Sequence, residues 1–179
     1  MTADPDHAPT TRVRPREQAD LAACGRLLGE VHAQDGYPRN RPAEPAGWLS
    51  PPALLAAWVA ESGGRLVGHV ALCRDEGDAS ARLWAERPGR SGAGPERAGV
   101  VSRLFVSPAA RGLGVGGLLM AEVARGASAR GLHPVLDVLA SDAAAAALYE
   151  RLNWQRLATV EERWGPGETV TVHCYAAPA

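Results

Sequence analysis

Hydrophobic residues recur along the chain in blocks whose spacing predicts alternating strands and helices. The clearest block spans residues 100–106, is rich in β-branched and large apolar residues, and ends before Pro108. This composition is typical of a buried strand. Apolar residues then recur at helical spacing, at Val115, Leu118, Leu119 and Val123. A helix is therefore expected to begin near Gly114.

The N-terminal half shows the same two periodicities. Apolar residues at helical spacing between Arg16 and His32 predict a helix that packs on a sheet, and Gly63-Gly64 predicts a hairpin turn. The expected elements are, in order, a short edge strand over 11–15, the helix over 16–32, a loop over 39–47, a short helix over 48–56, and hairpin strands over 57–61 and 66–74.

The C-terminal half predicts a strand over 134–139, a helix that runs to Leu152, and a hairpin over 155–160 and 169–175. Ser141-Asp142 is a suitable cap for that helix, and Asn153 suits the left-handed position at its end. The strand–helix–strand unit around residues 100–139 implies a parallel pair with a right-handed crossover.

These elements fit one domain over residues 11–179, after a disordered N-terminal tail over 1–10. A long polar insert over 75–99 interrupts the strands. Within it Asp78 is expected to cap a short helix over 79–86, and residues 88–95 are rich in Gly and Ser. Long loops in compact domains are often functional, so the insert is expected to be a flexible flap near a substrate entrance.

Charge and cysteine content exclude several classes of protein. The net charge of −1 gives no electrostatic footprint for nucleic acid or an acidic membrane surface. No apolar run approaches the roughly 20 residues that span a bilayer. Cys24, Cys73 and Cys174 lie far apart without metal-ligand spacing, which fits buried thiols in a reducing compartment. We therefore expect a cytoplasmic protein without a metal, a nucleic-acid partner or a membrane partner.

Candidate chemistry lies in the turn between the buried strand and its helix. Arg111, Gly112, Gly114 and Gly116 leave several backbone N–H groups without side chains over them. A helix N-terminus with bare N–H groups binds anions, and pyrophosphate suits it. Arg111 adds a charge that can hold phosphate bidentately. The plain alternative is a glycine turn that only lets the helix pack closely on the strand.

Arg-x-x-Gly-x-Gly after a strand, with Leu-Tyr-Glu-Arg-Leu on a later helix, resembles the acyl-CoA loop of the GNAT acetyltransferase superfamily. The resemblance extends over most of residues 11–175, and its specific part is residues 100–154. It implies an α/β (α+β) fold: a mixed, mostly antiparallel central sheet with one splayed parallel strand pair and helices on both faces. It also implies transfer of an acetyl group from acetyl-CoA to a primary amine by direct attack through a tetrahedral intermediate.

Cofactor contacts follow from the resemblance residue by residue. Backbone groups of Leu104, Phe105 and Val106 would pair with the pantetheine arm. The pyrophosphate would be held by main-chain N–H groups of Arg111, Gly112, Gly114, Val115 and Gly116. Asp142 stands where the family has an asparagine, and a carboxylate cannot donate a hydrogen bond to pantetheine carbonyls. Asp142 is therefore a departure from the family's motif. It either contacts CoA or only caps the helix.

Tyr149 stands at the family's tyrosine, seven residues after Asp142, and is the expected proton donor to the CoA thiolate. A phenol near pKa ~10 roughly matches a thiol near ~8.5. The alternative is a tyrosine half-buried on an amphipathic helix. The general base is unassigned, because the central strand lacks the usual glutamate. Weaker candidates are Glu161, Glu162, His69, Glu96 or a chain of waters.

The acceptor is expected to be a small-molecule or peptide amine, and no motif identifies it. Trp58 and Trp154 are expected in the core, and Trp48, Trp84, Trp164 and Tyr37 near the acceptor side. The last strands often mediate pairing in the family, so a homodimer is also open.

Two other functions fit some of the residues. A non-catalytic acyl-CoA-binding sensor would explain Asp142 and the missing glutamate. A dinucleotide-binding oxidoreductase would use Gly112, Gly114 and Gly117 with Asp137 about 20 residues on. The second is disfavoured because residues 107–111 separate the strand from the first glycine, and too little chain follows Asp137. A P-loop NTPase is excluded because the sequence contains no lysine.

Overall fold

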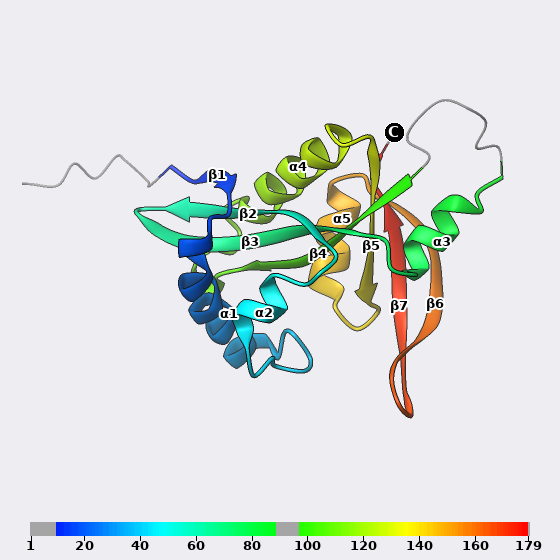
Figure 1. The fold of residues 1–179 in the computed structure, drawn as a ribbon, viewed down its shortest axis with the longest axis horizontal. Coiled ribbons are helices and arrows are strands. Elements are labelled where there is room, and N and C mark those ends of the chain that lie inside the picture. The colour runs from blue at the N-terminus through cyan, green and yellow to red at the C-terminus, as the bar shows by residue number, and fades with distance from the viewer. Residues whose placement is uncertain (1–9, 89–96, 179) are drawn as a thin grey trace, which may run out of the picture.

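A single mixed sheet forms the centre of the protein (Figure 1). The computed structural model describes residues 10–88 and 97–178. The sheet order is β1-β2-β3-β4-β5-β7-β6. Its strands are β1 (Arg12–Pro15), β2 (Leu54–Ser62), β3 (Arg65–Arg74), β4 (Arg97–Val106), β5 (Leu132–Leu139), β6 (Gln155–Gly165) and β7 (Glu168–Ala176).

Helices cover both faces of this sheet. The largest core cluster joins α4 and α5 to inward residues of β2, β3, β5 and β7 on one face. On the other face α1 and α2 pack on Val59 and Phe105, while α3 packs on the C-terminal strands. The helices are α1 (Leu21–Asp35), α2 (Pro45–Leu49), α3 (Ala79–Ala85), α4 (Val115–Ser128) and α5 (Ala143–Arg151). The mixed sheet with helices on both faces confirms the predicted fold class.

Strands β4 and β5 form the parallel pair, and the other neighbouring strands are antiparallel. The β4–β5 pairing covers only Arg97–Val100 against Leu132–Val135. Beyond Val100 and Val135 both strands continue, β4 alongside β3 and β5 alongside β7. The sheet therefore opens between β4 and β5, as the splayed pair requires.

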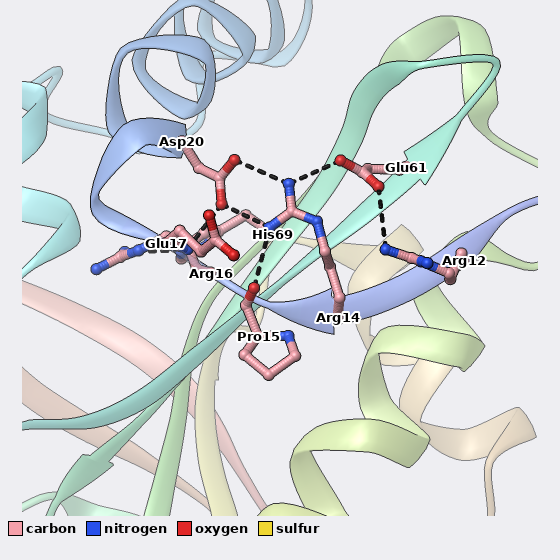
Figure 2. Close-up of polar contacts among 8 residues, drawn as sticks. All are labelled: Arg12, Arg14, Pro15, Arg16, Glu17, Asp20, Glu61 and His69. Atoms are coloured by element: carbon pink, nitrogen blue, oxygen red, sulfur yellow. Dashed lines mark hydrogen bonds and ion pairs between the residues drawn. The ribbon is translucent and has the colours of Figure 1, made fainter.

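A network of arginines fixes the first strand to the start of α1 (Figure 2). Arg14 donates to both carboxylate oxygens of Asp20, at 2.7 and 2.9 Å, and to Glu61 on β2 at 2.7 Å. Asp20 belongs to the 3₁₀ turn Gln18–Asp20 that precedes α1. The Arg14 guanidinium therefore holds the pKa of Asp20 below its ordinary value.

Several local expectations are confirmed. The predicted stripe of the first helix is buried at Cys24, Leu27, Leu28 and Val31, although the helix spans Leu21–Asp35 instead of 16–32. Asp142 caps α5 by accepting a hydrogen bond from the Ala145 amide at 3.0 Å. Asn153 follows α5 with a φ of 61°, the left-handed conformation for which asparagine is well suited.

Two local expectations are wrong. The short helix expected over 48–56 spans Pro45–Leu49, and β2 already begins at Leu54, because Pro51-Pro52 breaks the chain between them. Asp78 precedes α3, but its carboxylate accepts from the Glu76 amide at 3.2 Å and makes no cap to the helix.

Some predictions fall outside the described ranges. These are the N-terminal tail apart from Thr10, most of the Gly/Ser-rich stretch over 88–95, and Glu96. Within residues 10–88 and 97–178, no helix is long and apolar enough to cross a membrane. The same residues contain no group of three or more His, Cys, Asp or Glu arranged to hold a metal ion.

Candidate functional site at the opening between β4 and β5

A β-bulge shapes the edge of β4 that borders the opening. The register to β3 passes from Ser102 opposite Ala71 to Phe105 opposite His69, so β4 carries one residue more than its partner. Arg103 lies within this bulge with a φ of 53°, an uncommon conformation for a residue with a side chain. Such strain persists only where the surroundings hold it in place, and it is often found at functional sites.

His69 holds the bulge from the neighbouring strand. Arg16 donates to its Nε2 at 3.0 Å, so the ring's proton is on Nδ1, which donates to the Arg103 carbonyl at 2.9 Å. The ring also stacks on Phe105, with 5.0 Å between centroids. Burial lowers the pKa of His69 to about 4. His69 is therefore a neutral structural residue, and its single acceptor nitrogen is already occupied.

The expected cofactor segment of β4 borders the opening. Leu104, Phe105 and Val106 all follow Val100, the last residue paired to β5. The Phe105 side chain is buried against α1, and Leu104 and Val106 pack against the main core. Their side chains are therefore taken up by the interior, and the backbone at this edge is the part available to a ligand that lies along the strand.

The glycine turn follows directly at the end of β4. Gly112 and Gly114 have φ values of 75° and 78°, and a Cβ on either would meet no atom within 4 Å. Backbone conformation rather than lack of space therefore calls for glycine at both positions. Gly114 is the N-terminal cap of α4, whose first-turn N–H groups have no partner within the helix. The turn fits an anion such as pyrophosphate.

Gly116 and Arg111 make contacts that the sequence did not predict. A Cβ at Gly116 would lie 3.1 Å from the Leu148 side chain on α5, so Gly116 lets the two helices pack closely, beside Val115 in the core. Arg111 donates through both terminal nitrogens to Asp35 at the end of α1, at 3.0 Å for one of them. That ion pair would compete with any phosphate for the guanidinium.

Tyr149 enters the site from α5, on the α4 side of the sheet. Its side chain is only 6% exposed and packs near the rings of Trp154 and Tyr175. Burial raises the pKa of Tyr149 above its ordinary value, and the nearby Tyr37 and Asp142 raise it further. The phenol is therefore protonated throughout the neutral range.

Tyr37 approaches from the other face of the sheet. It lies against Trp48 and Phe105, with centroids 6.3 and 6.5 Å apart. Tyr37 packs on α1 and α2, and its hydroxyl raises the pKa of Tyr149 on α5. The positions of Tyr37 and Trp48 on the acceptor side stay predictions.

A hollow of about 320 Å³ lies on the Tyr37 side of the opening. We call it the polar hollow; its lining includes Ser102, Arg103, Asp137, Asp78, Glu162 and Trp164, together with the charged residues Arg74 and Glu76. Ser102 and Asp137 each follow the last β4–β5 pair by two residues. Asp137 therefore lies across the opening from Ser102. Sequence reasoning used Asp137 only for a dinucleotide fingerprint and missed this position.

Some of the remaining candidates for the general base and for the aromatic residues of the acceptor side line the polar hollow, and others do not. Glu162 lines it but is paired with Arg82 at 2.6 Å, whereas Glu161 is exposed on β6. Trp164 lines it and is 49% exposed, while Trp58 and Trp154 are core residues as expected. Trp84 is elsewhere, stacked on His133 with 3.7 Å between centroids.

Comparison with known proteins points to one family. The family model described as the Acetyltransferase (GNAT) family matches residues 24–154, which include β4, the glycine turn, α5 and Tyr149. No curated protein sequence matches the chain significantly.

Solved structures show the same fold at low sequence identity. The ribosomal-protein-S18-alanine N-acetyltransferase of Escherichia coli is 19% identical, with a TM-score of 0.65 and 94% of each chain covered. NAA60 of Arabidopsis thaliana in complex with acetyl-CoA is 19% identical, with a TM-score of 0.67, covering 93% of this chain and 98% of that one. An N-acetyltransferase from Staphylococcus aureus Mu50 is 16% identical, with a TM-score of 0.68 and 93% and 97% covered.

Proposed function

The chain belongs to the acetyltransferase (GNAT) family, and from this premise we propose that it transfers an acetyl group from acetyl-CoA to a primary amine. The observation that carries the proposal is the early end of the β4–β5 pairing beside the glycine turn. One edge with free backbone groups thereby adjoins one anion-binding turn. Acetyl-CoA, whose extended pantetheine arm is attached to a diphosphate, needs both.

The proposed cofactor contacts use backbone groups more than side chains. The β4 edge at Leu104, Phe105 and Val106 would pair with the pantetheine arm. The pyrophosphate would accept hydrogen bonds from the N–H groups between Arg111 and Gly116, among them those of Gly112, Gly114 and Val115. Asp142 remains a proposed contact of the same arm, although its carboxylate already caps α5.

Acetyl transfer also requires two kinds of proton transfer, one from the amine nitrogen and one to the CoA thiolate. An acceptor that arrives as an ammonium first loses one proton, which passes to solvent, so that its nitrogen regains a lone pair. The nitrogen then forms a bond to the acetyl carbon, the carbon–sulfur bond breaks, the nitrogen loses its second proton and the thiolate gains one. We assign protonation of the thiolate to Tyr149, which holds its proton because burial raises its pKa. Removal of the protons from the nitrogen is assigned to Asp137, whose carboxylate lines the polar hollow on the opposite face.

Binding is tested with a matched pair of variants at Gly114. Aspartate and asparagine both tolerate the left-handed conformation, but Gly114→Asp adds a negative charge to the turn and Gly114→Asn does not. In isothermal titration we expect Gly114→Asp to bind CoA at least tenfold more weakly than Gly114→Asn. Equal affinities of the two variants would show that the diphosphate does not bind at this turn.

Catalysis is tested by following free thiol from acetyl-CoA with a broad panel of amines. Steady thiol release together with an N-acetylated product in the mass spectrum supports the transferase. Tight CoA binding without thiol release from any amine would favour the non-catalytic sensor instead.

A further inference from the structure

The polar hollow carries charged groups of both signs, although the incoming amine requires only a negative one. Building on the proposed acetyl transfer, we propose that the acceptor is a small zwitterion of the α-amino acid type. Its ammonium group faces Asp78 and Asp137, and its carboxylate faces Arg103.

The acidic side of the hollow is prepared for a cation. Asp137 accepts hydrogen bonds from the Ser80 amide at 2.9 Å and from the Cys174 thiol, and Asp78 accepts one from the Glu76 amide at 3.2 Å. Neither carboxylate has an ion pair among the described residues, whereas Glu162 beside them is paired with Arg82. Burial raises the pKa of Asp78, and the neighbouring Asp137 raises it further. An ammonium between the two would relieve this repulsion.

Arg74 and Arg103 both bring a guanidinium to the hollow, and that of Arg103 lies beside Ser102, across the opening from Asp137. Arg103 donates from Nε to the Trp48 carbonyl at 2.6 Å and from Nη1 to the Ser102 hydroxyl at 3.0 Å. Its guanidinium carbon lies 4.9 Å from the centroid of the Trp48 ring. These contacts use Nε and Nη1, and Nη2 has no hydrogen-bond partner in the described part of the chain. Arg103 likewise has no ion pair there, so its charge is available to an anion.

The arrangement of the charges favours an amino acid over other amines. Ser102 joins the two sides, because it bonds to Arg103 and lies across the opening from Asp137. An α-amino acid places its ammonium and its carboxylate on one carbon, so it can meet both sides at once. A simple amine or a peptide N-terminus would leave the half-buried Arg103 without an anionic partner. A volume of about 320 Å³ also suits a small ligand.

The first test compares the free amino acids with their C-terminal amides, which keep the ammonium and lose the carboxylate. Thiol release from acetyl-CoA gives kcat/KM for each pair. We expect at least one amino acid to exceed its amide by about 100-fold, because a charge-assisted hydrogen bond in a half-buried site would be lost. Equal rates for acids and amides, or turnover of peptides and simple amines alone, would overturn the zwitterion and leave acetyl transfer standing.

Variants locate the carboxylate contact. Arg103→Gln is expected to raise the KM for the preferred amino acid about 100-fold and to abolish its advantage over the amide, while CoA affinity stays unchanged. Arg103→Lys keeps the charge and should recover part of the preference. The matched control is Arg74→Gln. Arg74 also lines the hollow, but it is exposed and its Nη2 already donates to the Pro52 carbonyl, whereas Nη2 of Arg103 is unbonded among the described residues. The preference should survive in this control. Its survival in Arg103→Gln would contradict the proposal.

A binding measurement separates this proposal from the proposed function. CoA-saturated protein is titrated calorimetrically with the twenty amino acids and their amides. Binding of an amino acid but not of its amide supports the zwitterion even without turnover. CoA binding without binding of any amino acid overturns the zwitterion alone, whereas failure to bind CoA overturns the proposed function.

Discussion

At the scale of single residues, the hydroxyl of Tyr149 is separable from the ring that carries it. The ring is buried between Trp154 and Tyr175, so Tyr149→Phe keeps the packing and removes only the proposed proton donor. We expect kcat to fall about 100-fold or more with little change in the KM for acetyl-CoA, since general acids contribute factors of about 10²–10⁴. Steady-state thiol release measures both constants.

A matched tyrosine controls for the loss of a buried hydroxyl. Tyr175 belongs to the same core, and its hydroxyl donates to Glu150 at 3.0 Å. Tyr175→Phe should therefore retain kcat, and both variants should melt within a few degrees of the wild type. A wild-type kcat in Tyr149→Phe would remove this residue from the mechanism.

His69 makes the stability of the protein dependent on pH. Because burial lowers its pKa to about 4, the unfolded chain binds a proton between pH 6.5 and 4 that the folded protein does not. The free energy of unfolding should therefore fall as the pH drops through this window, by about 3 kcal/mol for this residue. Urea unfolding at pH 7 and pH 4 measures the fall. His69→Gln should show a loss smaller by about that amount, and an equal loss would mean that His69 titrates normally.

At the scale of elements, α4 depends on a glycine that touches a neighbouring strand. A Cβ on Gly126 would lie 2.4 Å from the Trp58 ring of β2, which is 5% exposed. Overpacking costs about 1–3 kcal/mol, which we expect to exceed the gain of at most about 1 kcal/mol in helix propensity. Gly126→Ala should therefore lower the free energy of unfolding in urea.

Gly117 in the same helix is the control. There an added Cβ would meet only Leu152, at 3.9 Å, an ordinary contact. Gly117→Ala should leave stability unchanged or raise it through helix propensity. If both variants were equally stable, the close approach of α4 to Trp58 would not be a constraint on the sequence.

Elements with local signals could be predicted from the sequence, and those set by distant contacts could not. The strand at 100–106, the glycine turn, the Asp142 cap and the left-handed Asn153 each follow from short-range chemistry. The second helix was placed too late. Its end before Pro51-Pro52 follows from a local signal, but its start at Pro45 does not, because Trp48 and Leu49 are held by packing against α1.

The residues of the candidate site likewise fall into those that local motifs predict and those that depend on distant contacts. The turn and Tyr149 could be found from motifs, whereas Asp137 could not, because its relation to Ser102 depends on where the β4–β5 pairing ends. The pairing of Arg111 with Asp35 and of Arg103 with Trp48 joins segments 76 and 55 residues apart. The positive φ of Arg103 was equally hidden, since arginine gives no sign of a bulge.

At the scale of the whole molecule, the sheet consists of two halves, β1–β4 and β5–β7, that are joined by the short β4–β5 pairing. Four residue pairs join β4 to β5, and α4 also holds the halves together, because it packs on β2 and β3 on one side and on β5 on the other. A ligand that lies along the open edge would complete the sheet between the halves. The site is therefore also a place where backbone pairing is missing from the sheet. Ligand binding should protect backbone amides there from hydrogen exchange.

Hydrogen exchange can detect where that protection falls. Amides on the open edge of β4 exchange without global unfolding, so a bound pantetheine arm should slow them within seconds to minutes in peptides that cover residues 101–107 and 111–118. Ligand at 100 times its Kd also stabilises the whole fold by about 2.7 kcal/mol, but this slows only amides that exchange through global unfolding. Strand β1 (Arg12–Pro15), which β2 and β3 separate from β4 in the sheet, should show no early change. Early protection of β1, or none at 101–107, would mean that acetyl-CoA binds away from the opening between β4 and β5.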